Sequence, residues 1–123
     1  MAYFYIILGA ACGAPLRYYL QGRLQDSTGL LFPIGTLVVN LSGCFAIGML
    51  AALVEDRGFL DRNMRIAVLT GFLGSYTTFS TFAYESVEQL TAGELTQAAV
   101  NILVSVVGGI AAAWAGATLV RWA

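Results

Sequence analysis

The sequence has very little charge, and it lacks lysine and histidine altogether. Charged residues make up 11% of its 123 positions, and apolar residues make up 59%. A soluble domain usually carries about 25% charged residues, so this composition predicts a protein that resides in lipid. The six basic residues are all arginine, and the net charge of −1 provides no basic surface for nucleic acid. Without histidine, the chain also lacks the commonest general base and the commonest metal ligand.

Cysteine is scarce as well, and several familiar motifs are absent. Cys12 and Cys44 lie in separate apolar stretches, without the spacing of a metal site or of a disulfide framework. We interpret both as small buried apolar residues. No GxxxxGK[ST] motif for nucleotide binding is found. The apolar run that starts near Met1 has no basic residue before it, unlike a signal peptide, so we expect it to remain as a permanent helix.

Long apolar runs, by contrast, are abundant. A membrane-spanning helix needs about 20 mostly apolar residues, and four segments qualify, over about residues 3–20, 31–54, 66–88 and 95–120. The connections, such as Gln21–Gly29, are short and polar, and none has the length of a second domain. The sequence therefore predicts an all-α integral membrane protein with a single transmembrane domain over residues 1–123.

The arginines divide unevenly between the two sides of this arrangement. Four spans place both termini and the second connection on one side of the membrane. That side carries four arginines, namely Arg57, Arg62, Arg65 and Arg121. The other side carries Arg23 and, if its side chain snorkels to the interface, Arg17. The excess is a weak positive-inside signal, which leaves insertion in both orientations open.

Small residues recur at helix-packing spacing. Gly9 and Gly13 form a GxxxG step in the first segment, and Ala112 and Gly116 form a similar step in the fourth. Such steps let two helix backbones approach closely in a membrane, so we expect tight packing at both places.

Polar side chains inside the apolar runs are the most informative residues, because they cost free energy in lipid unless they find partners or water. In the second segment, Thr36, Asn40 and Gly43 share one helix face. Asn40 either forms a hydrogen bond between helices, worth about 0.6–2 kcal/mol, or lines a pore. In the fourth segment, Asn101 and Ser105 form a weaker stripe with the same two interpretations.

The third segment combines glycines and hydroxyl residues in the middle of a span. Glycine, serine and threonine are poor in helix interiors, so we expect a break near Gly74–Thr78. Carbonyl groups freed at membrane depth must be buried in protein or face a cavity, and they could hold a cation. Beyond the break, Phe79 and Phe82 share one face of the helix. Their rings either pack in the protein core or form part of a pore wall. Glu85 follows one turn later, either snorkelling to the interface or standing at a pore mouth.

Three of the four segments carry motifs that occur together in one known family. The first reads Gly9-x-x-x-Gly13-Ala14-x-x-Arg17-Tyr18. The second reads Pro33-x-Gly35-Thr36-Leu37-x-x-Asn40-x-x-Gly43-x-Phe45-x-x-Gly48. The third, the most specific, reads Gly71-x-x-Gly74-x-x-Thr77-Thr78-Phe79-Ser80-Thr81-Phe82. In this order and in a chain of this length, the motifs resemble those of the Fluc (CrcB-type) fluoride channels, and the resemblance covers the whole chain.

The resemblance implies a function and an assembly. Members of that family are passive, fluoride-selective channels in the plasma (inner) membrane of microbes, which they protect by exporting fluoride from the cytoplasm. They are dual-topology dimers, usually of two identical subunits inserted antiparallel, with two pores. A structural sodium ion lies at the dimer centre on backbone carbonyls of the broken third helix, which by position implicates Gly74 and Thr77. Some members pair unequal subunits, so the homodimer is an expectation here.

The resemblance also suggests roles for individual side chains. The expected pore and fluoride-binding residues are Asn40, Phe79, Phe82, Ser105, Thr36, Thr81 and Glu85. The expected helix-packing residues are Gly9, Gly13, Arg17 and Gly43. The chain departs from the family pattern on the fourth helix, where Asn101 stands in place of a common Tyr and Gly109 in place of a Ser found in some members. The polar track on that helix is therefore thinner.

Two other functions fit a chain of this size. A proton-coupled small multidrug transporter also has four helices, but that class places a carboxylate in its first helix, whereas the first acid here is Asp26 in a connection. A non-conducting membrane subunit would use its polar stripes only to hold helices together. We expect no enzyme, because the chain has no His and no nucleophile–base arrangement.

Overall fold

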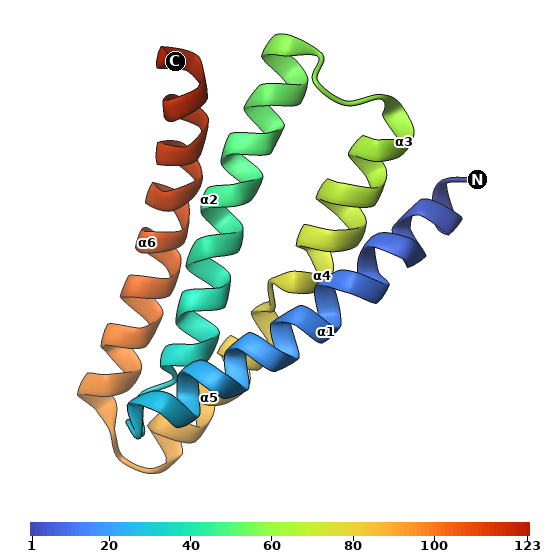
Figure 1. The fold of residues 1–123 in the computed structure, drawn as a ribbon. Coiled ribbons are helices and arrows are strands. Elements are labelled where there is room, and N and C mark those ends of the chain that lie inside the picture. Colours follow the sequence, from blue (N-terminus) through green and yellow to red (C-terminus); the bar gives the residue numbers. More distant parts are fainter.

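The computed structural model describes residues 1–123, and every regular element in it is helical. The elements are α1 (Ala2–Thr28), α2 (Ile34–Arg57), α3 (Arg62–Arg65), η1 (Ile66–Leu73), α4 (Gly74–Tyr76), α5 (Phe79–Thr91) and α6 (Leu95–Trp122). The elements α3 to α5 follow one another as a single broken rod, so the chain forms four rods (Figure 1). Both termini and the α2–α3 connection lie toward one end, and the α1–α2 and α5–α6 connections lie at the other (Figure 1).

The first helix is longer than the sequence predicts. It continues past Leu20 to Thr28 and ends at Gly29, which has a left-handed φ of 61°. The expected connection from Gln21 to Gly29 is therefore wrong over most of its length. Hydropathy marks where an apolar run ends, but glutamine, arginine and leucine still favour a helix in water. The second helix is shifted in the same way, since it begins at Ile34 and ends at Arg57.

Three segments are long and apolar enough to cross a membrane: Ile34–Arg57, Arg62–Thr91 and Leu95–Trp122. Four spans were expected, and α1 is not among these three. Its 27 residues are sufficient in length, but arginine, glutamine and tyrosine make its sequence less apolar. A crossing by α1 therefore stays a prediction.

The rods α2 and α6 lie side by side along their lengths (Figure 1). A side chain in place of Gly48 would collide with the carbonyl of Ala113, and one in place of Gly116 would collide with the carbonyl of Phe45. Small residues therefore set how closely these two backbones approach, as the Ala112–Gly116 step predicts.

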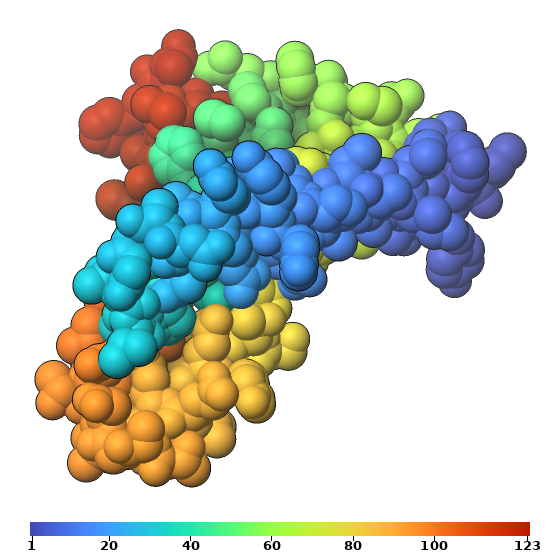
Figure 2. Space-filling view, turned by 60° about the horizontal axis from the view of Figure 1, so that its bottom comes forward, coloured from blue at the N-terminus to red at the C-terminus, as the bar shows by residue number.

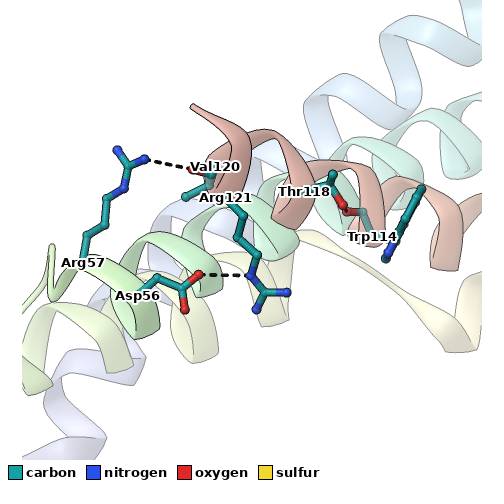
Figure 3. A network of polar contacts seen from close by, with 6 residues as sticks. All are labelled: Asp56, Arg57, Trp114, Thr118, Val120 and Arg121. Atoms are coloured by element: carbon teal, nitrogen blue, oxygen red, sulfur yellow. Dashed lines mark hydrogen bonds and ion pairs between the residues drawn. The ribbon is translucent and has the colours of Figure 1, made fainter.

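Two polar contacts join the C-terminal ends of the same rods. An Nη of Arg57 donates to the carbonyl oxygen of Val120 at 2.9 Å, which satisfies one of the last carbonyls of α6 (Figure 3). Nε of Arg121 donates to Oδ2 of Asp56 at 3.0 Å (Figure 3). The end of α6 is thereby tied to the end of α2.

The helix α1 packs against the broken rod through glycine. A Cβ on Gly9 would collide with the carbonyl of Ala67, and one on Gly13 would collide with the carbonyl of Phe72. The facing segment, η1, has π-helical hydrogen bonds, such as that from the N–H of Gly74 to the carbonyl of Leu69. Such wider turns are rare and mostly short, and here the widened segment lies in the closest contact with α1.

The third rod is broken at the expected place. Thr77 and Thr78 are both extended, with φ and ψ of −87° and 156° for Thr77 and −146° and 118° for Thr78. The side chain of Thr78 caps α5 by accepting from the N–H of Thr81. The prediction of a break within Gly74–Thr78 is therefore confirmed.

Few side chains are buried within the chain. The core cluster consists of Val39, Leu73 and Tyr76, whereas many large apolar side chains lie on the outside. The expectation that both cysteines are buried is wrong, because Cys12 is exposed and Cys44 is only partly covered. In a membrane protein the outward faces are apolar too, so an apolar sequence around a cysteine does not indicate burial.

Candidate functional site

A groove of about 430 Å³ lies between α2, the break, α5 and α6. Four of the predicted pore residues line it together: Asn40, Phe79, Phe82 and Ser105. Thr77, Thr78, Cys44 and Gly109 also line it. The fold thus gathers residues from three helices that the sequence separates widely.

Asn40 pairs with the backbone of the break. Its Nδ2 donates to the carbonyl oxygen of Thr78 at 2.8 Å, and its Oδ1 accepts from the N–H of Thr78 at 2.8 Å. These are the backbone groups that the interrupted helix leaves without partners. Asn40 therefore makes the hydrogen bond between helices that was one of its two expected roles, and it lines the groove as well. One N–H of its amide has no partner among these bonds, because the amide carries two donors.

The two phenylalanines form an edge-to-face pair on α5. Their ring centroids are 5.6 Å apart and the ring planes are inclined by 60°. Phe82 is 8% exposed, whereas Phe79 is 76% exposed. One ring is therefore fixed in the protein and the other stands at its surface, and both face the groove.

A chain of hydrogen bonds lies behind the groove and connects α6 to α5. Oγ of Ser105 donates to Oδ1 of Asn101, and Nδ2 of Asn101 donates to Oγ of Ser86 at 3.2 Å. Oγ of Ser86 donates in turn to the carbonyl of Phe82 at 2.8 Å. Asn101 is only 1% exposed. It thus acts as a support between a groove hydroxyl and the backbone of a groove phenylalanine, and it does not line the groove itself.

The other predicted polar residues lie in a second, larger space. A polar cleft of about 1020 Å³ lies between α1, the start of α2, α5 and the start of α6, and Thr36, Thr81, Glu85 and Arg17 line it. The elements that form it gather at one end of the molecule, where the α1–α2 connection (cyan) lies beside the α5–α6 end (yellow to orange) (Figures 1 and 2). We call this space the cleft and the smaller one the groove.

Within the cleft, three side chains form a short chain of hydrogen bonds. Nε2 of Gln21 donates to Oγ1 of Thr36 at 2.8 Å, and Oγ1 of Thr36 donates to Oε1 of Glu85 at 2.6 Å. A side chain at Gly35 would collide with the carbonyl of Gln21, so the close approach of α1 and α2 brings this chain together. Glu85 is held at the wall of the cleft, facing α2.

A threonine pair connects the cleft to the groove. Oγ1 of Thr78, on the groove wall, donates to Oγ1 of Thr81, on the cleft wall, at 3.0 Å. Hydroxyl groups therefore continue from one space to the other across the start of α5.

The proposed cation ligands lie at the break. Outside the regular helical hydrogen bonds, neither the Gly74 nor the Thr77 carbonyl accepts a hydrogen bond. Gly74 lies on the exposed surface of the chain. Backbone carbonyl oxygens at a helix break suit a hard cation, so the donor chemistry fits sodium. No group of three or more His, Cys, Asp or Glu that could hold a metal is found.

The remaining predicted packing residues lie where helices meet. A Cβ on Gly43 would collide with the side-chain methyl of Thr77, next to the break. Arg17 lines the cleft and forms no ion pair. Sequence reasoning missed Gln21, Ser86 and Gln89. Only their polar character at the end of an apolar run distinguishes them, and that signal is weak for a single residue.

Taken together, the fold is a small set of helices, three of them long and apolar enough to cross a membrane, with a polar cleft beside a groove. Its sequence matches the family model described as "CrcB-like protein, Camphor Resistance (CrcB)" over residues 4–117. Similar proteins are named fluoride-specific ion channels in several bacteria. The one from Solibacter usitatus is 44% identical, with 98% of this chain and 99% of that relative covered. The one from Chloroflexus aurantiacus is 44% identical, with 95% and 93% covered.

A third relative is longer. The fluoride-specific ion channel of Methylococcus capsulatus is 46% identical over 98% of this chain, but the chain spans only 53% of that relative. The chain belongs to the CrcB (Fluc) family of fluoride channels. This membership confirms the family that the sequence motifs indicate, and it confirms that the chain is a membrane protein and not an enzyme.

Proposed function

We propose that this chain is a passive, fluoride-selective channel and that the groove is its conducting route. The observation that carries the proposal is that four of the seven predicted pore residues, Asn40, Phe79, Phe82 and Ser105, line one groove in a chain that belongs to this family. The relatives at 44% identity are named for the same activity.

The groove offers donors without a fixed positive charge. Fluoride is small and strongly hydrated, so a pore must replace its water with hydrogen-bond donors that do not trap it. Asn40 has a free amide N–H. The hydroxyl of Ser105 donates to Oδ1 of Asn101. Because a hydroxyl group rotates freely about its C–O bond, it can donate to an anion in the groove instead. The edges of the Phe79 and Phe82 rings carry the positive part of the aromatic quadrupole.

The cleft leads into the groove as a wide polar entrance. Thr36 and Thr81 supply hydroxyl groups at its walls, and Glu85 stands beside them. The Thr78–Thr81 hydroxyl pair marks the passage from the entrance to the groove. A hydrated anion would exchange its water for these groups in steps.

A second copy of the chain would complete the groove. Phe79 is mostly exposed, and the groove is open along one side of the subunit. We propose a homodimer of antiparallel subunits with two pores, in the inner membrane of a microbe, with α1 as a fourth span. In such a membrane, fluoride would leave the cytoplasm down its electrical gradient without an energy source.

A structural sodium ion at the centre of this dimer is supported by the position of two backbone carbonyls at the break of the third rod. Gly74 and Thr77 would hold it, and ligands from both subunits would complete its shell. When bound, the ion would supply positive charge that favours anions near the groove and would hold the two breaks together.

Fluoride efflux from liposomes tests the proposal. Purified protein is reconstituted into vesicles loaded with potassium fluoride, and valinomycin carries the balancing potassium. We expect rapid release of fluoride and negligible release from chloride-loaded vesicles. A folded protein that releases no fluoride would contradict the proposal. It would favour a non-conducting subunit, or a transporter if the protein instead exported a quaternary ammonium dye with proton coupling.

A further inference from the structure

Two side chains in the cleft have buried polar atoms without any partner. Oε2 of Glu85 and both Nε2 and Oε1 of Gln89 are buried and make no hydrogen bond. Gln89 is 9% exposed, so its amide is almost entirely removed from water. Buried polar groups in folded proteins are nearly always hydrogen-bonded, and leaving one unpaired costs about 1–3 kcal/mol. Three such atoms on two residues that line the same cleft therefore point to a ligand.

The two residues lie on one face of α5 and line the cleft. Glu85 and Gln89 are four residues apart in the helix, and residues at this spacing are neighbours on the helix surface. The other carboxylate oxygen of Glu85 already accepts from Thr36. Thr36 is itself held by Gln21, so the free oxygen is held in a fixed position.

The charge of the cleft favours a cation at this place. Its walls carry four carboxylates and only two arginines. The carboxylates belong to Asp26, Glu85, Glu88 and Glu94, and the arginines are Arg17 and Arg23. Neither arginine forms an ion pair with Glu85, because the chain's one salt bridge joins Arg121 to Asp56. The entrance of a proposed anion route therefore carries an acidic group whose charge no protein group compensates.

We propose that Glu85 and Gln89 bind a monovalent hard cation, such as sodium or potassium, inside the cleft. Oε2 of Glu85 and Oε1 of Gln89 are its protein ligands, and water completes the shell. Hard cations take carboxylate and amide oxygens as ligands. A single carboxylate with a neutral amide matches one positive charge. This site is separate from the Gly74 and Thr77 carbonyls, and it does not depend on whether the chain conducts fluoride.

Equilibrium binding of radioactive sodium to the purified protein in detergent tests the site. The buffer holds choline in place of other monovalent cations and contains no fluoride. We expect Gln89→Leu and Glu85→Gln to weaken one class of sodium sites by about 10–100-fold, since even an outer-shell change at a metal site has an effect of this size. Glu88→Gln is the matched control, because it removes a neighbouring carboxylate of the cleft but neither ligand, and it should weaken sodium binding far less than either ligand variant.

Diffraction from crystals soaked in thallium(I) locates the ion, because this monovalent probe scatters anomalously. We expect a peak between Glu85 and Gln89 in the native protein and in Glu88→Gln, and no peak there in Gln89→Leu. A peak at the carbonyls of Gly74 and Thr77 would remain in all three proteins and would belong to the separate sodium proposal.

Two results would overturn the proposal. One is sodium binding of the same strength and stoichiometry in the native protein, Glu85→Gln and Gln89→Leu. The other is an ordered water between Glu85 and Gln89 that thallium does not replace. If Gln89→Leu fails to fold, Gln89→Glu decides the question. It places a second carboxylate in the site, so it should bind a cation more tightly, and unchanged affinity would contradict the proposal.

Discussion

The side-chain amide of Asn40 joins both backbone groups of Thr78, so α2 supplies the hydrogen bonds that the third rod loses at its break. One residue thereby stabilises the interruption and faces the groove beside it. The sequence leaves two roles open for Asn40, a contact between helices and the lining of a pore. Both are possible together, because the amide carries two N–H donors and only one of them donates to Thr78.

Asn40→Asp should stop fluoride conduction and destabilise the protein. Aspartate cannot donate to the Thr78 carbonyl or to fluoride, and its charge repels an anion. We expect efflux to fall by about 10² or more and the free energy of unfolding to fall by about 1–3 kcal/mol. Ser42→Ala is the control, because Ser42 lies on the same helix and its hydroxyl forms a hydrogen bond with the Tyr76 hydroxyl, but it does not line the groove. This variant should conduct fluoride like the native chain. Native efflux by Asn40→Asp would contradict the donor account.

Phe82→Ile should reduce fluoride efflux by about tenfold or more, since the aliphatic side chain has no positive ring edge. The aromatic pair with Phe79, worth about 0.5–1.5 kcal/mol, is lost as well. Tyr84→Ile changes an exposed aromatic residue on the same helix that does not line the groove, and it should conduct normally. Equal efflux by the native chain and Phe82→Ile would show that the ring edges are not needed.

Ser105→Ala should lower fluoride efflux and cost little stability. The change removes a groove hydroxyl and leaves Oδ1 of Asn101 without its donor, with an expected loss of about 1 kcal/mol. Ser105→Thr keeps the hydroxyl and is the matched variant. Efflux is measured in liposomes and stability by thermal unfolding in detergent. If the alanine and threonine variants conduct alike, the hydroxyl of Ser105 does not contact the ion.

Gly13→Ala should destabilise the protein by about 1–3 kcal/mol through overpacking, because the new methyl group collides with the Phe72 carbonyl and the Ser75 hydroxyl. Gly22→Ala is the control in the same helix, since a methyl group there meets no atom within 4 Å. It should be neutral or stabilising by up to about 1 kcal/mol. Thermal unfolding of both variants decides the matter, and a more stable Gly13→Ala would contradict the packing shown for α1.

Asp56→Asn should have a small effect, although its partner Arg121 lies far away in the sequence. Their side chains are 42% and 57% exposed, and exposed ion pairs contribute about 0–1 kcal/mol, less in high salt. The contact of Arg57 with the Val120 carbonyl remains intact in this variant. A loss of several kcal/mol in thermal unfolding would mean that this ion pair is far more important than its exposure indicates.

Much of the fold can be predicted from the sequence because the apolar runs are long and the exceptions in them are few. The number of helical rods and the break follow from composition, since Gly74 and the hydroxyl residues after it disfavour a helix. The motifs around Gly9, Asn40 and Phe79 identify the family. The end of α1 does not follow, because Gln21–Thr28 is polar yet helical, and hydropathy measures lipid contact, not helix formation.

The sequence by itself thus determined that the chain is a helical membrane protein, where its third rod breaks, and which side chains are out of place in lipid. Only the tertiary structure decided what those side chains contact. Periodicity indicates which residues share a face of their own helix, but the facing helix depends on where glycines such as Gly13 and Gly35 let backbones meet. For that reason the bonds from Asn40 to Thr78 and from Thr36 to Glu85, and the unpaired amide of Gln89, are visible only in the folded chain.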